Sequence, residues 1–525
     1  MRKQTIFVVL LITSALFLSC GKQEIKTIKL DVLRDKIAGG WAGKMIGVTY
    51  GAPTEFKAKG KTYDEKLHWT PDQVKGALRQ DDLYVQMSFM MAMDKYGMDA
   101  PAEKFAESFA TAGYPLWCAN VTARKNYFDG IMPPESGSPK YNLWADAIDF
   151  QIEADYIGFM CPGMPQTSNK ICDKIGHIMN YGDGVYGGMF VCALYTQAYF
   201  EKEIATIVKN ALKAIPAKSQ YAQCIQDIID LHAKYPDNWR SAWKEFNEKW
   251  VDTDISAPFN PFNIDAKING AFIVMGLLYG NGDFGKTMEI SIRCGQDSDC
   301  NPSNAAAVLG IRDGYSNIPD KWKSGIPEIA DSLFIFTDYS FNKVVEKTLQ
   351  YAKKMVLENG GQIQDNVVYI KEQIPKAPKR LEVSFPGIKP LYYAGVEDSN
   401  WVWKGNWKNV AKGWFKKMKV SDQKGAEASF KFRGSGILLI GSWDRDGGKA
   451  DIYIEGQLMR TIDTYYWVAN SGYPGAYLYH VLDLPDTNHT IRIVLNGKKN
   501  PKATGTNITL AGAVVYGPNK SQEYN

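Results

Sequence analysis

Residues 294–310 read CGQDSDCNPSNAAAVLG, and this stretch carries the most informative pattern in the chain. Asp297 and Asp299 stand one residue apart between two cysteines, after a helical run and before a segment of small residues. In a locally extended loop, residues two apart point the same way, so the two carboxylates are expected to converge on one point. Crowded carboxylates raise one another's pKa unless a hard divalent cation with oxygen ligands neutralises them.

A second acidic pair lies in RQDDLYV, residues 79–85, where Asp81 and Asp82 are expected to open a long amphipathic helix. Each pair alone also has an ordinary structural explanation. Asp is a favoured N-cap, and acids in a first helical turn are stabilised by the helix dipole without any metal. Spacing alone therefore leaves metal binding and helix capping both open.

The periodicity of apolar residues changes once along the chain and divides it into two folded parts. From about residue 28 to about 358 apolar residues recur at three and four, as in NGAFIVMGLLYG (269–280), which predicts helices. Beyond about 390 the period is two, as in EASFKFRGSGILLIGSW (427–443), which predicts strands. At 525 residues two domains are expected. We therefore predict a multidomain α plus β protein: an all-α domain over 21–366, a proline- and lysine-rich linker or strap over 367–390, and a jelly-roll-like β-sandwich over 391–525.

The N-terminus and the overall charge restrict where the protein acts and what it binds. Residues 1–20 have a basic start, an apolar stretch and a terminal cysteine, and they resemble a bacterial lipoprotein signal in which Cys20 is lipidated. Plain secretion is the alternative. The expected location is the periplasmic or cell-surface side of an outer membrane, with a lipid anchor. A net charge of +4 over this length gives no reason to expect a nucleic-acid partner. The other seven cysteines lack CxxC spacing and are expected to be mostly buried thiols.

Three stretches, taken in order, resemble the signature segments of the ADP-ribosylglycohydrolase family. They are GGWAGKMIGVTYGAPTEF (39–56), QDD (80–82) and GQDSDCNPSNAAAVLGIRDGY (295–315). The resemblance covers roughly residues 28–358 and implies an all-α domain that holds two divalent ions between its acidic elements. Magnesium is the usual ion, and Ca²⁺ and Mn²⁺ are alternatives. Because several motif positions differ from the family pattern, one of the two ions could be lost.

Carried over position by position, the resemblance assigns roles to individual residues. The implied metal ligands are Asp81, Asp82, Asp297 and Asp299, with Gln80 and Cys300 at motif positions where relatives carry hydroxyl side chains. Glu55 closes the first motif and is a candidate for proton transfer or for gating the site. The catalytic candidates are Glu55, Asp82 and Asp297.

Two further segments supply candidate substrate contacts. NYGDGVYGG (180–188) falls near a glycine-rich, substrate-contacting segment of relatives, which makes Asp183 and Tyr186 candidates, although an Asx turn would also explain Asp183. Glu153 and Asp155 are two residues apart and could line the same site, while a solvated face is the common alternative for such a pair.

The chemistry expected of these groups is glycoside hydrolysis. A divalent ion can orient a diol and activate a water, and a carboxylic acid can supply or remove the proton. An exported chain with an attached β-sandwich favours a glycan or glycoside substrate, a furanoside among them. Six aromatic residues of the sandwich are candidates for stacking on sugars or for filling its core: Trp401, Trp403, Trp407, Tyr465, Tyr466 and Trp467. The alternatives are a true ADP-ribosyl hydrolase outside the cytoplasm and a sugar-binding lipoprotein without turnover.

Overall fold

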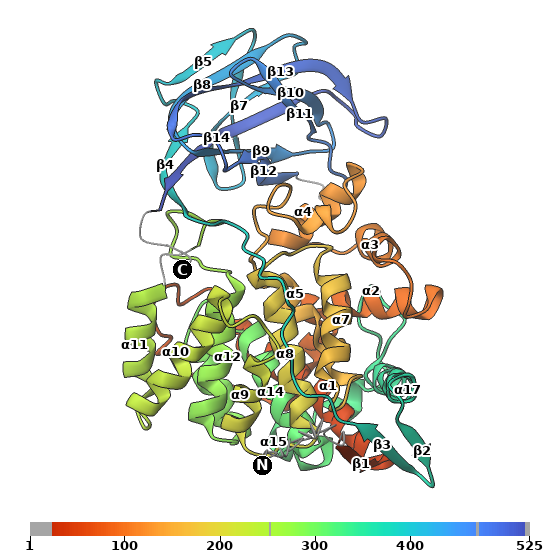
Figure 1. Ribbon diagram of the computed structural model, residues 1–525. Coiled ribbons are helices and arrows are strands. Elements are labelled where there is room, and N and C mark those ends of the chain that lie inside the picture. Colours follow the sequence, from red (N-terminus) through yellow and green to blue (C-terminus); the bar gives the residue numbers. More distant parts are fainter. Residues whose placement is uncertain (1–23, 251–253, 469–471, 520–525) are drawn as a thin grey trace, which may run out of the picture.

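The computed structural model describes residues 24–250, 254–468 and 472–519. A helical part is followed by a β-sandwich that lies on one end of it (Figure 1), which confirms the predicted multidomain α plus β fold. The predicted signal segment and Cys20 lie outside the described residues. Within the described residues, no helix has both the length and the apolar character needed to cross a membrane.

The helical domain contains long helices joined by short ones. Its α-helices are α1 Leu30–Gly51, α2 Asp81–Tyr96, α3 Ala102–Thr111, α4 Cys118–Phe128, α5 Asp149–Glu153, α6 Asp155–Phe159, α7 Pro165–Gly176, α8 Asp183–Ala198, α9 Ile204–Leu212, α10 Gln220–Lys234, α11 Trp239–Trp250, α12 Ala266–Gly280, α13 Phe284–Arg293, α14 Cys300–Asp313, α15 Asp320–Lys323, α16 Ile326–Ile329 and α17 Phe341–Glu358. Short 3₁₀ helices span Ala52–Thr54, Pro71–Arg79, Glu135–Gly137 and Tyr315–Asn317.

The central contact of this domain is the antiparallel packing of α1 on α14. Four glycines of α1, each four residues from the next, face four backbone positions of α14 and the turn before it. A Cβ on Gly39 would lie 2.0 Å from the carbonyl oxygen of Gly310, and one on Gly51 would lie 2.0 Å from that of Ser298. Such a close backbone approach is possible only without side chains. The glycine stripe therefore brings the end of α1 directly against the turn that carries Asp297 and Asp299.

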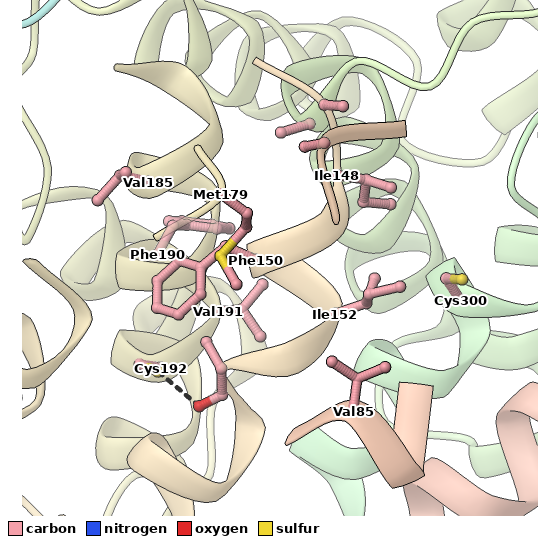
Figure 2. Packing of buried hydrophobic residues seen from close by; sticks show 14 of the residues in the cluster. Val85, Ile148, Phe150, Ile152, Met179, Val185, Phe190, Val191, Cys192 and Cys300 are labelled. Atoms are coloured by element: carbon pink, nitrogen blue, oxygen red, sulfur yellow. Dashed lines mark hydrogen bonds between the residues drawn. The ribbon is translucent and has the colours of Figure 1, made fainter. Parts of the chain in front are cut away.

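Helix α2 differs from its predicted amphipathic form, because residues 82–90 are all buried. Helices α8 and α12 are likewise buried along their whole length. Figure 2 shows Phe150 and Ile152 of α5 packed in the same apolar region as Phe190 of α8 and Val85 of α2. A helix enclosed on all sides carries apolar residues around its whole circumference, so its sequence shows no polar face.

A small sheet and an extended strap close the helical domain. Strands β1 Ile25–Lys29, β3 Val367–Lys371 and β2 Gln362–Gln364 form an antiparallel sheet in that order. The segment 367–390, predicted as a linker or strap, thus begins with a strand. Its remainder runs along the helices to the sandwich (Figure 1) and is fastened on the way, for example by a 3.0 Å contact between His177 Nε2 and Glu382 Oε2.

The C-terminal domain consists of two antiparallel sheets. One has the order β11–β10–β13–β8–β5, and the other β12–β9–β14–β7–β6 with β4 also paired to β14. The strands are β4 Ile388–Gly395, β5 Trp401–Lys404, β6 Lys408–Lys412, β7 Phe415–Ser421, β8 Glu427–Gly434, β9 Gly436–Trp443, β10 Gly448–Ile454, β11 Gln457–Asp463, β12 Tyr473–Val481, β13 Thr487–Lys499 and β14 Ile508–Pro518.

The middle of the second sheet, strands β9 and β14, is buried on both faces where the helical domain covers its outer side, whereas β4 and β6 at its margin are largely exposed. Every residue of β9 is buried, whereas β10 alternates between buried and half-buried positions. Across the interface the rings of Trp144 and Tyr477 stack with centroids 5.0 Å apart, and the Tyr516 hydroxyl donates to the Ile255 carbonyl. Of the six aromatic residues considered for sugar stacking, two are buried (Trp401 and Tyr466) and four are half-buried.

Candidate functional site: an acidic cluster between helices

The segment after α1 and the turn before α14 hold each other in place through backbone and hydroxyl contacts. Thr54 Oγ1 and Ser298 Oγ are 2.8 Å apart. The Phe56 amide donates to the Gln296 carbonyl, and the Gln296 amide donates to the Ala58 carbonyl. Glu55, in the middle of the first segment, is thereby fixed beside the turn.

The turn itself is not the extended loop expected from the sequence. Gln296 has a φ of 56° and Asp299 is helical, with its side chain accepting a hydrogen bond from the Cys300 amide. Asp299 thus also caps α14, as the alternative explanation predicted. Asp297 and Asp299 nevertheless converge, because the tight turn folds their side chains onto the same side as Glu55.

Carboxylates from three segments meet around Asp299. Ligand atoms of Glu55, Asp297 and Asp299 lie within 4.8 Å of one another, and so do those of Asp82, Asp299 and Cys300. We call Glu55, Asp82, Asp297 and Asp299 the acidic cluster. Asp297 and Asp299 are 3% and 4% exposed, Asp82 is fully buried, and Glu55 is exposed. The cluster therefore opens to solvent at Glu55.

The remaining predicted ligands sit less centrally. Asp81 is half-buried, and its Oδ1 accepts a hydrogen bond from the Asp82 amide. Gln80 is half-buried at the start of α2. Neither belongs to the sets of converging ligand atoms among the described residues. Cys300 does belong, with its Sγ 3.3 Å from Asp82 Oδ2, and its thiol is a soft partner among hard oxygens.

Lys44 of α1 is a site residue that the sequence reasoning missed. Its fully buried ammonium lies 2.8 Å from Asp155 Oδ2 and 3.4 Å from Asp82 Oδ1, and it donates to the Ile152 carbonyl at 2.9 Å. Burial lowers the pKa of Lys44, but Asp155 and Asp82 outweigh this and raise it, so the group stays charged. The available signal was a single lysine within the apolar, glycine-rich part of α1 over residues 38–51. Lys44 orients Asp82 and leaves Glu55, Asp297 and Asp299 without a cationic partner among the described residues.

Burial and mutual repulsion raise the pKa of every carboxyl group in the cluster. Burial first, and then the charges of its neighbours, raise the pKa of Asp297 to about 7. Burial and Asp297 raise that of Asp299 well above its usual value. The pKa of Glu55 rises to about 8 through burial of the carboxyl and through Asp299. Glu55 is exposed as a whole residue, while its carboxyl faces Asp297 and Asp299.

These groups match what a hard divalent cation requires. The donors are carboxylate oxygens, and Asp297 Oδ1 is buried without a hydrogen-bond partner. Buried acceptors without partners are uncommon in folded proteins. The acidic cluster therefore has both the ligand type and the unsatisfied charge of a divalent-cation site.

Polar side chains of α4 and α5 lie next to the cluster. Asp149 Oδ1 accepts from the Asn120 amide, and Glu153 Oε1 accepts from Asn120 Nδ2. The charge of Asp81 contributes to raising the pKa of both acids, after burial, which places them near the start of α2. Each of the three side chains keeps one buried oxygen without a partner. Sequence analysis singled out Glu153 only, and no local pattern marked Asn120 or Asp149.

The other predicted substrate contacts occupy different surroundings. Asp155 is fully buried and accepts from Tyr195 and Asn304 besides its pair with Lys44, so it is held within the protein. The solvated face considered for Glu153 and Asp155 is wrong, because both are buried. Tyr186 contacts the strap, where its hydroxyl accepts from the Glu382 amide at 2.7 Å. The role of each in substrate binding stays a prediction.

Asp183 belongs to a second group of acids. Its Oδ2 accepts from the Tyr221 amide at 3.1 Å, which is a long-range contact rather than an Asx turn. It lines a small cavity of about 30 Å³ together with Asp146, Asp254, Asp265 and Lys267. We call these five residues the Lys267 group. Lys267 forms an ion pair with Asp265. Burial lowers the pKa of Lys267, but the neighbouring acids, Asp265 above all, outweigh burial and raise this pKa.

Comparison with known proteins agrees with this architecture. The sequence profile of the ADP-ribosylglycohydrolase family matches residues 29–355, more than half of the chain. A curated relative, an A type blood alpha-D-galactosamine galactosaminidase from Flavonifractor plautii, is 27% identical over 124 residues. That match covers 22% of this chain and only 11% of the relative's length.

Two solved structures align with parts of the chain. An ADP-ribosylglycohydrolase-related protein complex aligns with a TM-score of 0.40 at 13% identity, over 62% of this chain and 99% of that one. A two-domain esterase (CEX) active on acetylated mannans aligns with a TM-score of 0.22 at 15% identity, over 37% of this chain and 51% of that one. On the family match over residues 29–355, which spans all three signature segments and the acidic cluster, the chain belongs to the ADP-ribosylglycohydrolase family.

Proposed function

We propose that the protein is an exported, metal-dependent glycoside hydrolase that cleaves an O-glycosidic bond in a glycan or glycoside. The observation that carries the proposal is the acidic cluster itself. Its carboxylates converge, yet among the described residues the only cation paired with them is Lys44, which pairs with Asp82. Asp297 Oδ1 has no hydrogen-bond partner there. Magnesium is the ion we expect, with Ca²⁺ and Mn²⁺ as alternatives.

The residues of the cluster have separable tasks. Asp297, Asp299 and Asp82 would hold the ion, with Lys44 fixing the orientation of Asp82. When bound there, a divalent ion would orient a diol of the sugar, withdraw charge from the leaving oxygen and acidify the attacking water. Glu55 is the exposed carboxyl of the cluster, so it is the group that can exchange a proton with a substrate oxygen.

The polar side chains of α4 and α5 provide hydrogen-bond acceptors for a polar substrate. Asn120, Asp149 and Glu153 each offer a buried oxygen without a partner beside α2. Sugar hydroxyls are donors, and the binding of several hydroxyls would satisfy acceptors that are costly to leave unpaired. This arrangement supports a sugar substrate and does not select a particular sugar.

The choice of a glycan over ADP-ribose rests on two supports. A relative carries the name of a galactosaminidase, although the match covers a small share of both chains. The chain also has a lipoprotein-like N-terminus and a β-sandwich outside the family region. A true ADP-ribosyl hydrolase and a sugar-binding protein without turnover are the competing functions.

The first test is metal binding. Mg²⁺, Ca²⁺ and Mn²⁺ are titrated calorimetrically into metal-stripped mature protein and into Asp297→Asn. We expect binding in the wild type and a loss of at least about 100-fold in affinity in the variant, since even outer-shell partners contribute 10–100-fold. Asp313→Asn, the same change at the far end of α14, serves as the control and should bind as the wild type. Absence of binding in the wild type would contradict the metal-dependent function.

The second test is the substrate. Release of free sugar from a glycan panel, and of ADP-ribose from ADP-ribosylated protein, is measured with the expected metal present. Sugar release that Asp297→Asn abolishes supports the glycosidase, and release of ADP-ribose alone supports the first alternative. Sugar binding without any release, in a protein that binds the metal, supports the second alternative.

Export and anchoring form a separate part of the proposal and rest on residues 1–20. Fractionation of cells that produce the full chain should place it with the membranes, and Cys20→Ser should release it from them. A wild-type protein found in the soluble fraction would remove the lipid anchor from the proposal without affecting the proposed chemistry.

A further inference from the structure

A polar pocket of about 420 Å³ lies where the helical domain meets the sandwich. The helical side contributes the last turns of α4 and the loop after it, including Lys125, Phe128 and Asp129. The sandwich side contributes β11 and β12, including Arg460 and Asp463. Its volume falls within the range of about 300–1,000 Å³ that ligand pockets occupy.

One cation in this pocket is left over when the charges are paired. Lys125 forms an ion pair with Asp129, and Lys449 lies 3.4 Å from Asp463. The side chain of Arg460 forms no ion pair or hydrogen bond among the described residues, although Asp129 is near enough to act on its charge, and its guanidinium lies over the ring of Tyr141, 4.6 Å from the centroid. Stacking on a ring leaves the N–H edge of a guanidinium free, and that edge matches a carboxylate in two parallel hydrogen bonds.

The other walls suit a sugar ring. Phe128 is 41% exposed at the rim. The Asn126 and Asn500 side chains also line the pocket; their Nδ2 groups donate within the protein, which leaves their amide oxygens as acceptors for sugar hydroxyls. Aromatic faces with planar polar side chains around them bind sugars through stacking and through hydrogen bonds to hydroxyls. Because Lys125 is paired with Asp129 and Lys449 with Asp463, the charge that remains in the pocket is the positive charge of Arg460.

Helix α4 connects this pocket to the acidic cluster. Asn120, in its first turn, contacts Asp149 and Glu153, and Phe128, its last residue, stands at the pocket. At a rise of 1.5 Å per residue, the eight steps along the helix from Asn120 to Phe128 span about 12 Å, a distance that a short oligosaccharide covers. One chain could therefore reach both places.

We propose that this interdomain pocket binds an acidic sugar unit, such as a uronic acid, of the glycan that the acidic cluster cleaves. Arg460 receives the carboxylate, and Phe128 supports the ring. The inference rests on the proposed function for the identity of the chain as substrate. It also gives the sandwich a task, which is to complete a binding site that neither domain has alone.

The test measures binding of galacturonate and galactose, two sugars that differ by the carboxylate, to full-length mature protein in the presence of a chelator. Ligand-observed NMR titration should give a galacturonate Kd at least about tenfold lower than the galactose Kd, the factor that about 1.4 kcal/mol provides. Arg460→Gln should remove this difference. Arg433→Gln, which removes an exposed charge from β8 of the same sandwich, is the matched control and should keep it.

Further measurements keep the test decisive. If Arg460→Gln fails to fold, Phe128→Ala at the exposed rim should weaken galacturonate binding severalfold. Equal binding of the two sugars by the wild type, no binding of either, or full galacturonate binding by Arg460→Gln would overturn the inference. Asp297→Asn should still bind galacturonate, so failure of the catalytic proposal and failure of this one remain distinguishable.

Discussion

The protein buries two groups of acids, and they are neutralised in different ways. In the Lys267 group, the ammonium of Lys267 pairs with Asp265 and lies among the acids that surround the small cavity, although Asp254 Oδ2 there is also buried without a partner among the described residues. In the acidic cluster, the nearest ammonium, Lys44, is shared between Asp155 and Asp82 and leaves Asp297 Oδ1 without a partner. The comparison teaches that a group of acids becomes a candidate metal site when its own chain does not supply the counter-charge.

The sharpest way to break this comparison is to remove each lysine. Lys44→Met and Lys267→Met should each destabilise the protein by about 3–5 kcal/mol, because each leaves buried carboxylates unpaired. Urea unfolding with and without Mg²⁺ measures the effect. Mg²⁺ should stabilise Lys44→Met more than it stabilises Lys267→Met or the wild type, since a divalent ion beside Asp82 also replaces part of the lost positive charge. Equal responses of the two variants to Mg²⁺ would contradict the distinction between the two groups.

The pH dependence of stability sharpens the same distinction. The pKa of Asp297 is about 7 in the folded protein and near its usual value of about 3.9 when unfolded. Between these values the folded state binds more protons, so stability falls as pH rises. We expect the metal-free protein to lose on the order of 2–3 kcal/mol between pH 5 and pH 8.

Thermal unfolding across this range, with chelator and with Mg²⁺, provides the check. Magnesium should reduce the loss at pH 8, where the carboxylates are ionised, and change little at pH 5, where protons compete with the ion. Asp297→Asn removes one of the raised carboxyls and should make the metal-free pH profile shallower. If the stability of the metal-free wild type did not change with pH, the pKa values of the cluster carboxyls would not be raised in the folded protein.

The glycine stripe offers a smaller effect that separates fold from site. Gly39→Ala and Gly51→Ala each force a Cβ against a backbone carbonyl of the opposing segment and should cost about 2 kcal/mol. Gly51 faces Ser298, inside the acidic turn, whereas Gly39 faces Gly310 at the other end of α14. Calorimetry should therefore find metal affinity reduced about tenfold in Gly51→Ala and unchanged in Gly39→Ala. Gly113→Ala, with open space around the added atom, is the control for both.

Much of the fold could be predicted from periodicity, and the failures have a common cause. Helix α2 and strand β9 lie against neighbours on every side, so their sequences lost the polar positions that mark an exposed face. The small sheet around β3 was missed because its strands are short and far apart in the sequence.

For the site, the sequence supplied the acids but not their partners. Asp82, Asp297 and Asp299 stand in motifs that local spacing and family resemblance both point to, and they do converge. Lys44 meets Asp82, and Asn120 meets Glu153, only after the chain folds, through contacts between residues distant in sequence. The counter-charge of an acid is a property of tertiary packing, so its presence or absence could not be read from the spacing of the acids.

The smallest expected effect concerns the strap that lies over the Lys267 group. Glu382 lines that cavity and pairs with His177, the buried residue that follows α7. Burial lowers the pKa of His177, but the hydrogen bond to Glu382 outweighs burial and raises it. Burial raises the pKa of Glu382, but the same hydrogen bond outweighs burial and lowers it.

The sign of the pH effect follows from both shifts. The contribution of His177 is complete below its unfolded pKa of about 6.5 and is lost as pH rises through the folded value. That of Glu382 is present above about 4.5 and is lost as pH falls through its lowered value. His177→Gln should therefore cost up to about 1 kcal/mol near pH 5.5 and less at pH 8. His232→Gln is the control. Because burial lowers the pKa of His232, this substitution should raise stability at pH 5.5 relative to pH 8, opposite to the change expected for His177→Gln. A loss of stability that peaks at pH 5.5 in both variants would show that the strap contact is not its source.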